Sequence, residues 1–135
     1  MKTVFADACY WIALLNPKDQ LHVRAREVSR DLGPCRIVTS EMVLAEVLNG
    51  LSGFGNAVRR SAVETIRRLE SNPNVEIAPQ TSIQFRSAAE HYSSRPDKEW
   101  SVTDCASFLA MESKGLSEAL THDHHFKQAG FVTLL

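Results

Sequence analysis

The sequence contains few cysteines, and none of them form a pair. Cys9, Cys35 and Cys105 lie far apart, and no Cys-x-x-Cys motif occurs. Neither a disulfide framework nor a structural zinc site is therefore indicated. Unpaired thiols of this kind fit a reducing compartment, so we expect a cytoplasmic protein.

An excess of charge of one sign is also lacking. Fifteen lysines and arginines stand against 16 aspartates and glutamates, which leaves a net charge of -1 at pH 7. The chain therefore has no global basic field of the kind that marks dedicated duplex-DNA binders. Any contact with nucleic acid would have to be local.

Long apolar runs are absent as well. No segment approaches the ~20 apolar residues that span a bilayer, so we expect no membrane association. Asp7 interrupts the apolar start, which does not resemble a secretory signal. The chain of 135 residues is 44% hydrophobic and 23% charged, without repeats or a long linker. These values predict a single domain, residues 1–135, with a real core.

Short apolar segments alternate with amphipathic ones along the chain. Strands are expected at 2–7, 35–39, 75–78, 116–121 and 131–134. Helices are expected at 8–15, 19–32, 40–51, 56–70, 81–94 and 101–114, and residues 121–126 have the character of a tight polar turn. This alternation predicts an α/β fold with a mostly parallel sheet between helix layers.

The helical period also predicts which side chains are buried. Helix 40–51 is expected to bury Leu44, Val47, Leu48 and Leu51. Helix 81–94 is expected to bury Phe85, Ala88, Ala89 and Tyr92. Glu46 lies on a different side of the first of these helices and has no charged neighbour at helical spacing. This isolation is common for a glutamate that faces a polar cleft, although a lone glutamate is more often simply exposed.

Three aspartates stand at the ends or starts of predicted elements. Asp7 and Asp123 each follow a strand, so both are expected at the carboxyl edge of the sheet, where open α/β proteins bind ligands. Taken alone, a strand-end aspartate such as Asp7 more often caps the next helix, and only partner carboxylates elsewhere would reverse this. Asp104 is the fourth residue of a capping box that begins at Ser101, and this role is compatible with a place in a site.

Four motifs in this order resemble the PIN domain, and in particular the small VapC-type toxins of bacterial toxin–antitoxin pairs. The motifs are V-F-A-D at 4–7, S-E-M-V-L-A-E-V at 40–47, S-V-T-D-C-A-S-F at 101–108, and A-L-T-H-D-H-H-F followed by A-G-F between 119 and 131. The resemblance implies a three-layer α/β/α sandwich, a metal-dependent endoribonuclease acting on RNA, a homodimer and a separate antitoxin protein. It also implies an acidic metal-binding and catalytic cluster of Asp7, Glu46, Asp104 and Asp123.

Such a cluster has a physical basis of its own. Mg²⁺ and Mn²⁺ prefer carboxylate and water oxygens, and four converging carboxylates without a metal would repel one another. Thr103, His122 and His124 are candidates for substrate contact. For the histidines, including His125, a surface turn or an incidental metal ligand competes with that role.

The chain also departs from the family in two places. Cys9 stands where serine or threonine is common, and His124 and His125 stand where many members have another acidic residue. The main alternative is a PIN-like module that has lost catalysis and binds RNA or protein. A phosphatase of the haloacid dehalogenase type would need a second aspartate at position 9, and a purely structural protein would need each acid to be a cap or a turn residue.

Overall fold

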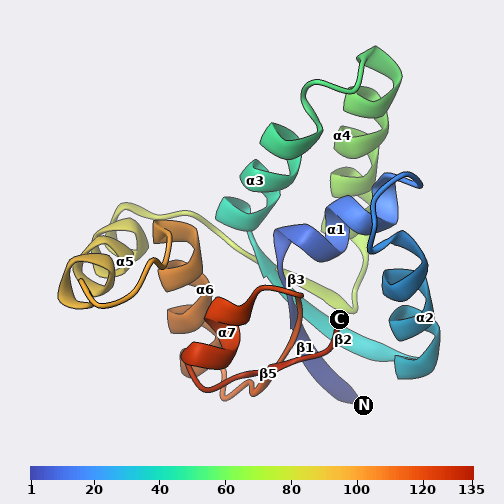
Figure 1. Cartoon of the computed structure of the whole chain (residues 1–135). Helices are drawn as coiled ribbons and strands as arrows, with labels where there is room; N and C mark the ends of the chain where they lie inside the picture. Colours follow the sequence, from blue (N-terminus) through green and yellow to red (C-terminus); the bar gives the residue numbers. More distant parts are fainter.

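A five-stranded sheet forms the centre of the computed structural model, which describes all residues, 1–135 (Figure 1). Its strands are β1 (Lys2–Ala6), β2 (Cys35–Ser40), β3 (Val75–Ala78), β4 (Glu118–Leu120) and β5 (Val132–Thr133). They are arranged in the order β3-β2-β1-β4-β5, and every neighbouring pair is parallel. The predicted α/β class and parallel sheet are confirmed.

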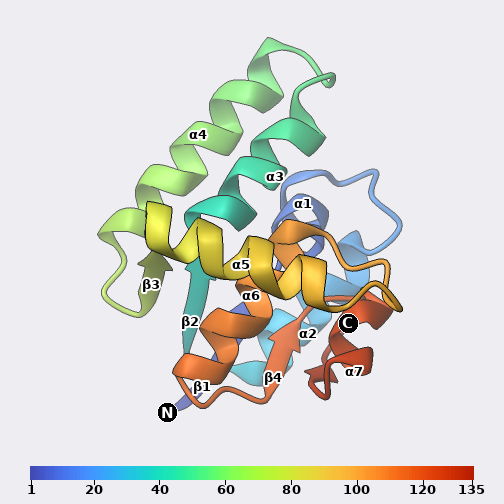
Figure 2. The same cartoon turned by 90° about the vertical axis from the view of Figure 1, so that its left-hand side faces the viewer.

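Helices cover both faces of this sheet. They are α1 (Ala8–Leu15), α2 (His22–Leu32), α3 (Glu41–Leu51), α4 (Asn56–Ser71), α5 (Ser82–Ser94), α6 (Val102–Ser113) and α7 (His124–Gln128). Figure 1 shows α1 and α2 on one side of the sheet and α6 and α7 on the other. The α3–α4 hairpin extends beyond the sheet, and α5 packs on the outside of α6 (Figure 2).

The strand order reverses at β1. The chain first builds the sheet outward through β2 and β3, and then returns to place β4 on the free side of β1. The backbone N–H of Asp7 donates to the carbonyl of Leu120 at 3.2 Å, just beyond the β1–β4 ladder. Parallel sheets open a crevice at the carboxyl ends of their strands where the order reverses. The residues after β1 and β4 therefore meet at this crevice.

The core contains 23 buried hydrophobic residues on the two faces of the sheet. Phe108 of α6 joins the C-terminal segment to it, because its ring lies 5.0 Å from Trp100, 5.0 Å from Phe126 and 5.7 Å from Phe131 (centroid distances). Two of these contacts are edge-on, a favoured geometry for aromatic pairs. The helix α6 has no exposed residue from its start to Met111, and it carries no charge between Cys105 and Met111.

The segment after β4 differs from the prediction. Residues predicted as a tight polar turn instead begin the short helix α7, and the strand predicted at 116–121 is reduced to β4. The cause is a cap: the Asp123 carboxylate accepts a hydrogen bond from the backbone N–H of His125 at 2.9 Å. An aspartate at this position satisfies an N–H group that a helix start leaves without a partner.

Two predicted core stripes are also partly wrong. Phe85 and Tyr92 of α5 are 51% and 55% exposed, whereas Ala88 between them is fully buried. The helix packs mainly against α6, so only a narrow strip is covered. In α3, Leu48 is 37% exposed and Val43 is fully buried instead. A periodic stripe gives the direction of the buried face, but the neighbours decide its width.

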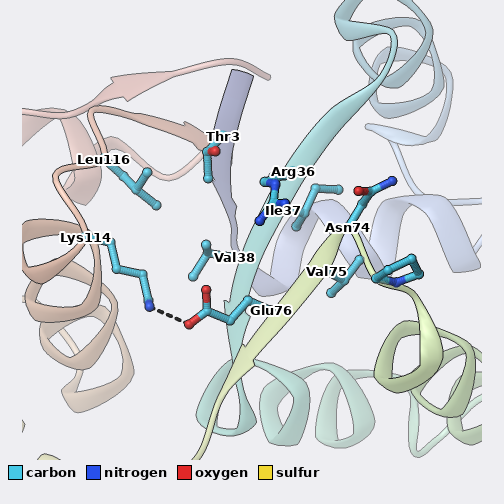
Figure 3. Close-up of a pocket in the computed structure, with 10 residues that line it drawn as sticks. Thr3, Arg36, Ile37, Val38, Asn74, Val75, Glu76, Lys114 and Leu116 are labelled. Carbon is cyan, nitrogen blue, oxygen red and sulfur yellow. Dashed lines mark hydrogen bonds and ion pairs between the residues drawn. The ribbon is translucent and has the colours of Figure 1, made fainter. Parts of the chain in front are cut away.

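A pocket of about 330 Å³ lies on the sheet at the end opposite to the crevice (Figure 3). It is lined by side chains from the starts of the first three strands, including Thr3, Arg36 and Val75. Lys114, just after α6, forms an ion pair across it with Glu76 of β3.

No helix in the structure has the length and apolar character needed to cross a membrane.

The position of Phe108 leads to a stability prediction. Phe108→Ala should lower the free energy of unfolding by about 3–5 kcal/mol, because it leaves a cavity between three aromatic rings. Phe85→Ala is the matched control, since it removes the same atoms from an exposed site and should cost less than about 1 kcal/mol. Urea unfolding monitored by circular dichroism measures both. Equal effects would contradict the assignment of Phe108 to the core.

Candidate functional site

A cavity of about 670 Å³ opens at the carboxyl ends of β1 and β4. The four predicted acidic residues all line it: Asp7, Glu46, Asp104 and Asp123. They come from four separate segments, namely the end of β1, the middle of α3, the first turn of α6 and the start of α7. The fold therefore brings together carboxylates that are distant in the sequence.

Asp7 is the most buried of the four acids, with only 6% of the residue exposed. The hydroxyl of Thr121 donates to its Oδ2 atom at 2.9 Å. Burial raises the pKa of Asp7 to about 6, and the charges of Asp104 and Glu46 add to the rise, although hydrogen bonds from the Ala8 N–H and Thr121 oppose it. Asp7 occupies the N-cap position of α1 but does not make the usual capping bond.

Glu46 projects from α3 toward the other acids and is half-buried. Burial raises the pKa of Glu46, and the charges of Asp104 and Asp123 add to the effect. A side-chain hydrogen bond with Thr103 opposes it. Thr103 thus lies beside Glu46, and it is not among the residues that line the cavity. Glu46 lines the cavity, which is the less common of the two positions that its lack of a charged helical neighbour allowed.

Asp104 serves the helix and the cavity at once. Its Oδ2 atom accepts from the backbone N–H of Ser101 at 3.0 Å, and its own N–H donates to the Ser101 hydroxyl at 3.0 Å. The predicted capping box is therefore present. Because these bonds fix the carboxylate against the start of α6, Asp104 needs no further rearrangement to face the cavity.

The histidines after β4 occupy three different environments. His122 lines the cavity, whereas His124 is exposed at its side and its ring lies 4.4 Å from that of His125. The His125 ring is largely covered, and its Nδ1 atom lies 3.0 Å from Asp104 Oδ2 and 3.4 Å from Asp123 Oδ1. Of the two histidines predicted to contact substrate, only His122 is therefore part of the cavity wall.

Several residues of the site could not be found by sequence reasoning. Thr121 holds Asp7 from 114 positions away, and no spacing rule connects them. Cys9 lies 3.3 Å from the Thr121 hydroxyl, and burial together with the charge of Asp7 raises the pKa of its thiol. Asn49 and Glu99 also line the cavity. Of these residues, only Cys9 was singled out by the motifs, as a departure from the family pattern.

The donor set suits a divalent cation. Carboxylate oxygens from four separate segments line the cavity, and carboxylate oxygen is the ligand that Mg²⁺ and Mn²⁺ commonly take in proteins. The mutual repulsion that helps to raise the pKa values of Asp7 and Glu46 is relieved when a cation lies between the charges. The residues present therefore fit a metal centre.

Comparison with known proteins gives consistent results. The PIN domain family model matches residues 4–132. The 23S rRNA-specific endonuclease VapC20 of Mycobacterium tuberculosis, in strains CDC 1551 and H37Rv, is 33% identical over 132 residues, which cover 96% of this chain and 95% of the relative.

Solved structures show the same fold. The crystal structure of M. tuberculosis VapC20, described as a sarcin-ricin loop cleaving toxin, has a TM-score of 0.84 at 30% identity and covers 96% of both chains. FitAcB from Neisseria gonorrhoeae has a TM-score of 0.64 at 19% identity, and VapBC2 from Rickettsia felis, bound to promoter DNA, has 0.63 at 13%. These two share the fold, and cover 98% and 97% of this chain respectively.

The raised pKa of Asp7 predicts how stability varies with pH. The folded protein holds this proton up to a pH of about 6, whereas the unfolded chain releases it near 3.8. The free energy of unfolding should therefore fall as the pH rises from about 4 to 7, by roughly 3 kcal/mol from this group. Asp7→Asn removes the titrating charge, so with EDTA present it should stabilise the protein at pH 7 by about 1–2 kcal/mol after loss of a hydrogen bond.

Urea unfolding at pH 5 and pH 7 measures this difference. Asp31→Asn is the control, because it removes an exposed carboxylate of α2 that does not line the cavity. An Asp7→Asn variant that is less stable than the wild type at pH 7 would show that the carboxylate is not strained in the metal-free protein.

Proposed function

This chain belongs to the PIN domain family, and from that membership we propose that it is a metal-dependent endoribonuclease and the toxin of a toxin–antitoxin pair. The observation that carries the proposal is the single cavity lined by Asp7, Glu46, Asp104 and Asp123. The likeness of this chain to VapC20, an endonuclease specific for 23S rRNA, supports RNA as the substrate class. The reaction is hydrolysis of a phosphodiester bond.

The four carboxylates are the proposed metal-binding and catalytic residues. Mg²⁺ or Mn²⁺ bound there supplies charge neutralisation at the phosphate and a water of lowered pKa for in-line attack. The protein positions three of these carboxylates by hydrogen bonds: the Thr121 hydroxyl donates to Asp7, the Ser101 N–H to Asp104, and the His125 N–H to Asp123. Asp7 must lose its proton to act as a ligand, so metal binding should weaken below a pH of about 6.

Substrate contacts are proposed around this centre. His122 lies in the cavity wall, and His124 is exposed beside it, so both can reach a phosphate or a base of a bound RNA. Thr103, the third residue predicted to contact substrate, does not line the cavity, and its side chain counteracts the raised pKa of Glu46 instead. The net charge of -1 gives no general attraction for RNA, which is consistent with recognition limited to the region of the cavity.

A separate antitoxin protein is the proposed partner. The description of VapC20 as a toxin, at 30% identity to this chain, supports this, because the VapC-type toxins that the sequence resembles are paired with an antitoxin. An antitoxin would inhibit the enzyme by covering the cavity or by placing a side chain near the carboxylates. We also propose a homodimer and a cytoplasmic location.

The proposal predicts RNA cleavage that depends on both metal and carboxylates. Purified protein should cut a pool of structured RNAs that includes 23S rRNA when Mg²⁺ or Mn²⁺ is present, and EDTA should stop the reaction. The double variant Asp7→Asn/Asp104→Asn should lose at least about 100-fold in rate, since it removes two ligands and the charge they place at the phosphate.

Asp31→Asn serves again as the control, because it removes an exposed carboxylate far from the cavity. Circular dichroism should show that all variants are folded. If the folded wild type neither cuts RNA nor binds a divalent ion, the nuclease proposal fails. The better interpretation would then be a PIN-like module that binds RNA or protein without catalysis.

A further inference from the structure

The imidazole of His125 lies among the carboxylates of the site. Its Nδ1 atom is 3.0 Å from Asp104 Oδ2 and 3.4 Å from Asp123 Oδ1, and its side chain is only 18% exposed. We propose that His125 is a nitrogen ligand of the divalent ion, and that this nitrogen makes the site prefer Mn²⁺ to Mg²⁺ more strongly than carboxylates alone would. The inference rests on the proposed metal-dependent function.

The backbone on both sides of His125 holds the ring in place. Its N–H donates to Asp123 Oδ1 at 2.9 Å, which fixes the first turn of α7. The next residue, Phe126, is fully buried and packs edge-on against Phe108, with the ring centroids 5.0 Å apart. The imidazole is therefore anchored by a cap before it and a core contact after it. Metal ligands bind with least cost when their position is set in advance in this way.

Nitrogen and oxygen donors are close enough to share one ion. Asp123, His124 and His125 each offer a ligand atom, and the three atoms lie within 4.8 Å of one another. Asp104 Oδ2 is closer still to the His125 ring. His124 is 72% exposed, so its ring can turn to solvent, whereas the covered ring of His125 has no such freedom. Of these two imidazoles, only that of His125 is held in a covered position beside the carboxylates.

The identity of the donor atom decides which ion is favoured. Mg²⁺ demands oxygen ligands and binds imidazole poorly, whereas first-row transition ions accept nitrogen readily. If a carboxylate stood at position 125, all the proposed metal ligands would be oxygen atoms. With His125 there, one of them is a nitrogen atom. The simpler alternative is that His125 only positions Asp104 through their hydrogen bond, and the two roles differ in whether nitrogen touches the metal.

Pulsed electron paramagnetic resonance of the Mn²⁺-loaded full chain separates these roles. A coordinated imidazole produces ¹⁴N modulation of the electron spin echo, which a histidine outside the coordination sphere does not. We expect this modulation in the wild type and its loss in His125→Asp and His125→Gln, with Mn²⁺ still bound. His124→Asn and His122→Asn are the matched controls and should retain it.

Competition between the two ions gives a second readout. The ratio of the Mg²⁺ to the Mn²⁺ dissociation constant should fall about tenfold in His125→Asp, because the substitution restores an oxygen donor. The wild-type spectrum tests the role of nitrogen without any variant. Thermal unfolding shows whether each variant is folded.

The outcomes distinguish this inference from the proposed function. Bound Mn²⁺ without ¹⁴N modulation, or modulation that disappears with His124 or His122 instead, overturns the role of His125 and leaves the nuclease proposal intact. A folded wild type that binds no Mn²⁺ overturns both. Modulation that depends on His125, together with the fall in the ion ratio, supports the inference.

Discussion

The pairing of β1 with β4 is the contact on which the rest of the site depends. It makes the strand order reverse at β1, so that the segment after the first strand meets the segment after the fourth. Asp7 thereby receives the hydroxyl of Thr121, and Asp123 enters the same cavity. Without this pairing Asp7 and Asp123 would follow strands that do not meet. The crevice arises because parallel strands on either side of the reversal turn their following segments to opposite faces.

Electrostatics makes this site costly for the metal-free fold. Burial and neighbouring negative charges raise the pKa values of Asp7 and Glu46 together. The protein limits the cost by giving some acids a structural role as well: Asp104 closes the capping box of α6, and Asp123 caps α7. These hydrogen bonds stabilise a carboxylate at a helix start and hold it facing the cavity. A capping role and the proposed role as a metal ligand are therefore compatible for Asp104 and Asp123.

Where sequence reasoning was wrong, tertiary contacts decided the outcome. Phe85 and Tyr92 have the spacing of a buried stripe, but α5 contacts little beyond α6, so both remain exposed. Residues 121–126 have turn composition, but the cap by Asp123 and the buried ring of Phe126 begin a helix there. The approach of His125 to Asp104 and the bond between Thr121 and Asp7 join distant segments, and no local pattern encodes such contacts.

The sequence by itself determined the alternation of strands and helices, the parallel sheet, the capping box at Ser101 and the four acidic candidates. Each of these follows from local periodicity, from the residues that begin a helix, or from the four motifs that occur in a fixed order along the chain. Only the tertiary structure decided how far Asp7 is buried, which hydroxyl donates to it, and that His125 is covered beside Asp104 whereas His124 is exposed. The physical reason is that burial and long-range hydrogen bonds depend on which segments the sheet brings together, and the strand order sets this only once the whole chain has folded.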